Sequence, residues 1–229
     1  MKFHSSAALL QATALKLGLA VALFAAAPVA ATEKAQPKDH NHSHSHGSHS
    51  KKSEIYKGYF EDDQIENRSL SDWAGNWQSV YPHLTEGTLD PVMEHKAEHG
   101  TKTAVQYKDY YLIGYKTDVD AIEIDGDTVR FVKDSGTASG AYTYDGYEIL
   151  TYKKGNRGVR YIFQKVSGDE SAPEYIQFSD HKISPAAADH YHLYWGDDRA
   201  ALLKEVTNWP TYYPAELTGQ QIVEEMVAH

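Results

Sequence analysis

The sequence predicts a mainly β fold, in which an antiparallel β-barrel or sandwich carries added helices. Aromatic and β-branched residues, which favour strands, dominate residues 103–193. Dipeptides that favour tight hairpin turns interrupt this segment at Asp125-Gly126, Asp145-Gly146 and Gly155-Asn156. Consecutive hairpins make an antiparallel meander, and a meander of this length usually closes into a barrel or folds as a sandwich.

The N-terminus has the features of a signal peptide. Residues 17–29, LGLAVALFAAAPV, form an apolar run that is too short to span a bilayer. Val29 and Ala31 place small residues at the −3 and −1 positions of a cleavage site. We therefore expect residues 1–31 to be a signal peptide cleaved near Ala31, and the exported protein to have no membrane anchor.

A polar, low-complexity segment, TEKAQPKDHNHSHSHGSHSKK, follows at residues 32–52. It has no apolar face, so we expect a disordered tail ahead of a single folded domain at residues 53–229. Because imidazole is the commonest transition-metal ligand, we interpret the tail as a weak metal collector rather than a linker without a role. Its histidines are His40, His42, His44, His46 and His49.

Helices are expected on both sides of the meander. Residues 53–100 are predicted to be mainly helical, and the clearest helix has Asp90 as its N-cap and Gly100 as its stop. His95 and His99 lie four apart on that helix, where an exposed polar face is a more frequent explanation than a metal site.

The C-terminal segment is predicted to be helical again. The residues DDRAALLKEVTN at 197–208 and TGQQIVEEMVAH at 218–229 each begin with helix-starting side chains. The intervening NWPTYYP, residues 208–214, is expected to be an aromatic connector packed over one end of the barrel.

Charge and cysteine content narrow the function classes. The formal net charge is −10, so the chain is a poor candidate for binding nucleic acid or anionic membranes. It contains no cysteine, which rules out a disulfide framework and thiolate metal ligands. Any bound metal must be held by histidine, aspartate or glutamate, a ligand set that suits Zn²⁺ and also Cd²⁺, Ni²⁺ or Cu²⁺.

Three histidines gather in DHKISPAAADHYHLYWG, residues 180–196. Strand alternation places His181 on one face of a strand with Tyr175, and His190 with His192 on one face of the next. If the two strands pair as a hairpin, all three imidazoles lie on the same side. Three histidines hold a metal and leave a fourth position open, whereas the alternative is three unrelated polar residues near a barrel mouth.

Several motifs together resemble the ZinT (YodA) family of periplasmic zinc- and cadmium-binding proteins. The matching stretches are NRSLSDWAGNWQSVYP, YDGYEILTYKKGNRGVRY, YIQFSDH, HYHLYWG and NWPTYYP. The resemblance implies a lipocalin-like (calycin) β-barrel with helical segments N-terminal to and after it, whose first strand opens at Gly75-Asn76-Trp77. It also implies that His181, His190 and His192 are the zinc ligands. Some members carry a cysteine pair, which this chain lacks.

The leading hypothesis is a periplasmic zinc-binding protein that is not an enzyme. The resemblance implies that it captures Zn²⁺, and also Cd²⁺, and passes zinc to the solute-binding protein of a zinc ABC importer. One alternative is a zinc metalloenzyme whose open three-histidine site activates water, although the sequence has no HExxH or paired-carboxylate motif. Another is a lipocalin-type carrier of a small apolar ligand. The fourth ligand, which is water, a carboxylate or the histidine-rich tail, stays open.

Overall fold

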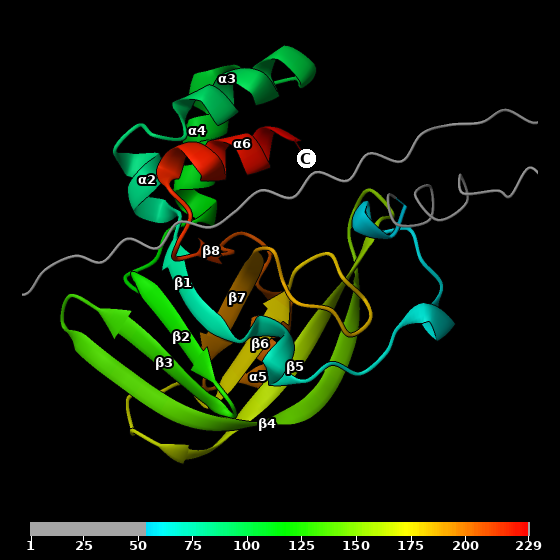
Figure 1. Cartoon of the computed structure of the whole chain (residues 1–229). Helices are drawn as coiled ribbons and strands as arrows, with labels where there is room; N and C mark the ends of the chain where they lie inside the picture. The colour runs from blue at the N-terminus through cyan, green and yellow to red at the C-terminus, as the bar shows by residue number, and fades with distance from the viewer. Residues whose placement is uncertain (1–53, 229) are drawn as a thin grey trace, which may run out of the picture. The chain divides into compact units, whose positions relative to one another are not determined.

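The computed structural model describes residues 54–228, so the predicted signal peptide and histidine-rich tail lie outside the described residues. Eight antiparallel strands form a closed barrel in sequence order, which confirms the barrel prediction over the sandwich (Figure 1). The strands are β1 (Gly75–Ser79), β2 (Ala121–Asp125), β3 (Thr128–Lys133), β4 (Gly136–Thr151), β5 (Arg157–Gly168), β6 (Tyr175–Ser179), β7 (Tyr191–Gly196) and β8 (Thr211–Pro214).

The helices are interleaved with the strands rather than confined to the two ends of the sequence. Three of them lie between β1 and β2, and one lies between β7 and β8. They are η1 (Asp62–Gln64), η2 (Leu70–Trp73), α2 (Tyr81–Thr85), α3 (Asp90–His99), α4 (Ala104–Gly114), α5 (Arg199–Lys204) and α6 (Gly219–Ala228). Among the described residues, no helix is both long and apolar enough to cross a membrane.

Helix α4 lies where the sequence analysis placed the start of the β-rich segment, and that expectation was wrong. Thr103 caps the helix, since its hydroxyl accepts a hydrogen bond from the Gln106 backbone N–H at 3.2 Å. The Gln106 side chain accepts in return from the Thr103 N–H at 3.0 Å, which completes a capping box. The apolar and tyrosine side chains of the helix do not form one stripe, so the capping spacing was the sequence signal for it.

Two of the three predicted turns are confirmed. Gly126 adopts a positive φ of 60° in the β2–β3 hairpin, and Gly155 adopts 87° between β4 and β5. The third prediction was wrong, because β4 continues through Asp145-Gly146 as one strand. The pairing of β4 with β5 shifts register between Tyr144 and Tyr147, so this glycine serves a β-bulge.

The segment NWPTYYP is also not the connector that was expected. Its residues Thr211–Pro214 form β8, which pairs with β1 through Trp77 and Pro214 and with β7 through Tyr191 and Tyr212. Strand β8 therefore closes the barrel and lies directly beside the strand that carries His192.

Large aromatic side chains fill the barrel interior. Trp73 stacks on Phe178 with ring centroids 4.6 Å apart, and Tyr161, Phe163 and Tyr191 pack in the same fully buried cluster. A second core joins α2, α3, α4 and α6, which gather together in Figure 1, to Tyr213 of β8. This second core covers the outer side of the barrel wall at β8.

Candidate metal centre

Strands β6 and β7 form the predicted hairpin. Ser179 lies opposite His192 and Gln177 opposite Tyr194, so these side chains share one face. Tyr191 and Leu193, on either side of His192, belong to the core in the barrel interior. Because side chains alternate along a strand, His192 points out of the barrel, toward the layer outside the wall.

His181 and His190 lie just beyond the ends of the two strands, in the loop of residues 180–190. His181 has a positive φ of 63°, the only such non-glycine residue among those described. Strand alternation therefore does not extend to His181, and the conformation of the loop determines where its side chain points. His181 is exposed, His192 is half-buried and His190 is buried, so the group is open on the His181 side.

The structure brings the three predicted histidines together. The ring centroid of His181 lies 5.9 Å from that of His190 and 5.8 Å from that of His192, and the last two are 6.2 Å apart. Imidazoles around tetrahedral zinc, with Zn–N distances of about 2.0–2.1 Å, place their centroids roughly 5 Å apart. A movement of less than about 1 Å by each ring would close the group around such an ion.

A hydrogen bond to Thr211 determines the tautomer of His192. The Thr211 hydroxyl donates its single hydrogen to the Trp209 carbonyl at 2.9 Å, so it accepts from the His192 Nδ1–H at 2.8 Å. The neutral ring then has its lone pair on Nε2, the nitrogen that remains available to a metal. Thr211 was not predicted from the sequence, because its role depends on the pairing of β8 with β7.

The surroundings of His192 also keep its ring neutral. Burial lowers the pKa of His192 well below its usual value, and the nearby His181, His190 and Arg160 lower it further. Arg160 is buried, with its guanidinium carbon 3.2 Å from the Tyr194 ring centroid. A neutral imidazole is the form that binds metal.

Two tyrosines stack on the other imidazoles. Tyr56 lies on His181 with centroids 4.5 Å apart, and Tyr213 lies almost parallel to His190 at 4.9 Å. Tyr213 is fixed by the second core, so the orientation of His190 is coupled to the packing of the helices. A cavity of about 460 Å³ adjoins this group, and its lining includes Tyr56, His181 and His192.

A buried ion pair shapes the loop that carries His181. The Arg68 guanidinium donates to both oxygens of Asp180, at 2.6 and 2.9 Å, and both side chains are fully buried. The Asp180 carboxylate also accepts a hydrogen bond from the Lys182 backbone N–H at 3.3 Å, which closes a turn around His181. Arg68 therefore holds the turn in which His181 adopts its left-handed backbone conformation.

Further contacts of Arg68 connect the same loop to η2. Its guanidinium donates to the Ala186 carbonyl at 2.8 Å and to Asp72 at 2.7 Å, and it lies 4.1 Å from the Trp73 ring centroid. Arg68 belongs to a stretch that marked the family resemblance, but its role was not predicted. Its main partner, Asp180, is 112 residues away in sequence.

The remaining histidines that the sequence singled out are placed differently. Those of the tail, from His40 to His49, lie outside the described residues. His95 and His99 lie close to Glu98 on α3, a different element from the hairpin that carries the other three histidines.

A profile of the ZinT (YodA) family, described as periplasmic lipocalin-like zinc-recruitment, matches residues 51–229. The Bacillus subtilis protein named "Probable metal-binding protein YrpE" is 62% identical over 176 residues, which cover 76% of this chain and 70% of that protein. The zinc-binding protein AdcA of Streptococcus pyogenes serotype M1 is 52% identical over 180 residues, but the match spans only 35% of AdcA.

A solved structure supports the same relationship. The Zn(II)-bound ZinT-like domain of Streptococcus pneumoniae AdcA superimposes with a TM-score of 0.74 at 48% identity, covering 76% of this chain and 97% of that domain. Fold, family profile and relatives agree on a lipocalin-like barrel and on zinc as the ligand. The chain therefore belongs to the ZinT (YodA) family of periplasmic lipocalin-like zinc-recruitment proteins.

Proposed function

We propose that this protein captures Zn²⁺ in the periplasm through His181, His190 and His192 and passes it to the solute-binding protein of a zinc ABC importer. The observation that carries the proposal is the meeting of these three imidazoles at one end of the β6–β7 hairpin, with centroids 5.8–6.2 Å apart. The Thr211 hydroxyl leaves the lone pair of His192 on Nε2, as a metal ligand requires.

The groups around the ligand set, more than the ligands themselves, favour a captured ion over a reaction. Three neutral nitrogens and no sulfur bind Zn²⁺ and also accept Cd²⁺, Ni²⁺ or Cu²⁺, with a fourth position left for water or an incoming ligand. The carboxylates next to the histidines in sequence are engaged by cations, Asp180 by Arg68 and Asp189 by Lys182 at 2.9 Å. We therefore assign neither of them as the general base that a hydrolase would need, and propose that the protein is not an enzyme.

The filled barrel supports metal as the cargo in preference to an apolar molecule. Trp73, Tyr161 and Tyr191 are completely buried in the interior, where a lipocalin-type carrier would hold its ligand. His192 instead points out of the wall, and His181 and His190 lie in the loop beyond the strand ends, with His181 exposed, so an ion reaches them without opening the barrel.

Export and delivery complete the proposal. Residues 1–31 direct the chain to the periplasm and are removed, and the histidine-rich tail collects ions and supplies a transient fourth ligand. Because single imidazole ligands bind zinc weakly, such a tail raises the local concentration of zinc without competing with the three-histidine site.

Replacing Thr211 with valine should weaken zinc binding by about 10–100-fold, as loss of an outer hydrogen-bond partner of a metal ligand does. Valine preserves the shape of the side chain but cannot accept the His192 Nδ1–H. Competition with a chromogenic chelator measures the affinity, and Thr211→Ser, which retains the hydroxyl, should bind zinc as the unmodified protein does. Equal affinity for the valine and serine variants would show that Thr211 does not orient the ligand.

Delivery to the importer predicts direct transfer of zinc. When zinc-loaded protein is mixed with the metal-free solute-binding protein from the same organism, the transfer rate should rise with the concentration of the acceptor. The rate of spontaneous release, measured with excess chelator, provides the comparison. A transfer rate that equals spontaneous release at every acceptor concentration would contradict the hand-off but not the three-histidine site.

A further inference from the structure

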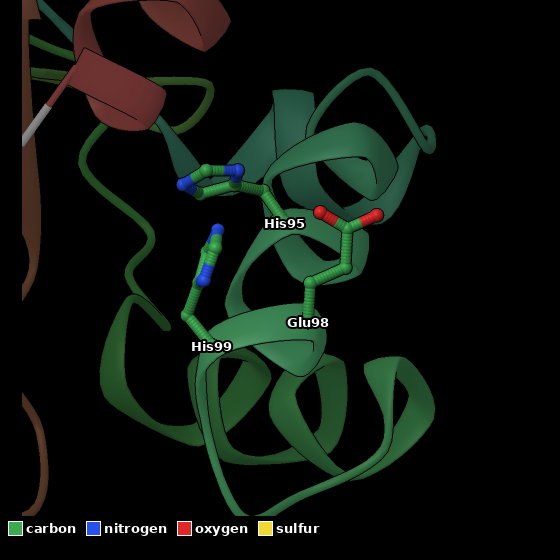
Figure 2. Close-up of side chains that lie close together, drawn as sticks. All are labelled: His95, Glu98 and His99. Carbon is green, nitrogen blue, oxygen red and sulfur yellow. The ribbon is translucent and has the colours of Figure 1, made fainter.

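A second group of metal-ligating side chains lies on α3, away from the barrel wall. His95, Glu98 and His99 are spaced i, i+3 and i+4, which places them on one face of the helix. Each offers one ligand atom, and these atoms all lie within 4.8 Å of one another. Figure 2 shows the two imidazoles turned toward each other, and their centroids are 4.7 Å apart.

The neighbouring cations do not neutralise the Glu98 carboxylate. Lys96 lies over the Tyr111 ring at 5.5 Å, and Lys102 lies over the Tyr107 ring at 6.0 Å. Lys108, on the adjacent helix α4, pairs with Asp90 at 2.6 Å. None of the ion pairs within residues 54–228 includes Glu98, so its charge is available to a cation held by the two imidazoles.

The helix backbone holds the three side chains at this spacing. Val92 and Met93 of α3 are buried in the second core, so the helix is anchored before any ion binds. His99 is the last helical residue, ahead of the Gly100 C-cap. The partial negative charge of the last helical turn also favours a cation there.

We propose that His95, Glu98 and His99 form a second binding site for a divalent transition-metal ion such as Zn²⁺ or Cu²⁺. Two nitrogens and one carboxylate are an established zinc ligand set, and water would fill the remaining positions. Because Glu98 and His99 are exposed and His95 is only half-buried, the bound ion exchanges readily with solvent. The site is separate from the three-histidine group and does not depend on its function.

The test uses the full chain with its other histidine clusters removed. In this background variant, the tail residues His40, His42, His44, His46 and His49 are replaced by serine, and His181, His190 and His192 by alanine. Titration with Zn²⁺ against a weak chromogenic indicator then measures the remaining sites. The background variant should bind one ion per chain, and adding His95→Ala with His99→Ala should abolish this binding.

Two substitutions of glutamate on the same helix provide a matched comparison. Glu98→Gln should weaken binding at least about tenfold, since even the loss of an outer partner of a ligand costs that much. Glu94→Gln, one turn earlier and also exposed, should leave the affinity unchanged. No binding by the background variant, or equal binding after both α3 histidines are replaced, would overturn the proposal.

The unmodified chain provides a second test, which does not depend on whether the background variant folds. After the first equivalents of Zn²⁺ have been bound, further additions should shift the imidazole NMR signals of His95 and His99, while the signal of His83 stays in place. If the signals of His95 and His99 did not move at saturating Zn²⁺, the proposed site would also be wrong.

Discussion

Replacing His181 and His190 together with alanine should lower the affinity for Zn²⁺ by at least about a hundredfold. Loss of an outer partner of one ligand already costs about 10–100-fold, and this variant loses two ligands of three. The remaining His192 cannot hold the ion alone at the affinity of a three-nitrogen site. Competition with a chromogenic chelator measures the change, in a chain whose tail histidines have been replaced by serine.

The control for this experiment is a histidine outside the hairpin and outside α3. His83 is hydrogen-bonded to the Gln78 side chain at 3.1 Å, and glutamine at position 83 preserves polar contact there. His83→Gln should therefore bind zinc with unchanged affinity. If the double alanine variant retained the affinity of the control, the three-histidine assignment would be wrong.

Substitution of Arg68 should produce the largest loss of stability. Removing one partner of a buried ion pair leaves the other charge buried and unpaired, which costs about 3–5 kcal/mol. Arg68→Met preserves much of the side-chain volume while leaving Asp180 without its two guanidinium hydrogen bonds. The free energy of unfolding from urea denaturation should fall by that amount, and zinc affinity should fall as well, because the turn at His181 loses its anchor.

An exposed arginine provides the matched control. Arg130 pairs with Glu123 on the surface of β2 and β3, where half of the arginine side chain is accessible to solvent. Exposed pairs contribute about 0–1 kcal/mol, so Arg130→Gln should change stability little and zinc binding not at all. Equal losses for the two variants would show that the Arg68–Asp180 pair does not anchor the loop.

Local patterns in the sequence were enough to single out the histidines of the candidate site. Alternation in the hairpin strands and the absence of cysteine were sufficient to single out three histidines of one hairpin, of which only His192 lies within a strand. The same reasoning placed His181 within a strand, whereas the chain turns at this residue with φ at 63°. A single left-handed residue in a loop has no periodic signature, so alternation could not reveal it.

Contacts between distant segments were beyond prediction from local patterns. Thr211 meets His192 only because β8 closes the barrel, and the residues of β8 were interpreted as a connector. Arg68 reaches Asp180 across 112 residues of sequence. Helix α4 was missed for a different reason, since its tyrosine-rich composition favours strands and hid the capping box at Thr103.

The most direct measurement is an anomalous-difference map from crystals of the protein loaded with one equivalent of Zn²⁺, recorded at the zinc absorption edge. The strongest peak should lie about 2.0–2.1 Å from one ring nitrogen of each of His181, His190 and His192, with Nε2 as the ligand atom of His192. A strongest peak at His95 and His99 of α3, or anywhere else with none between the three histidines, would contradict the assignment of the zinc site.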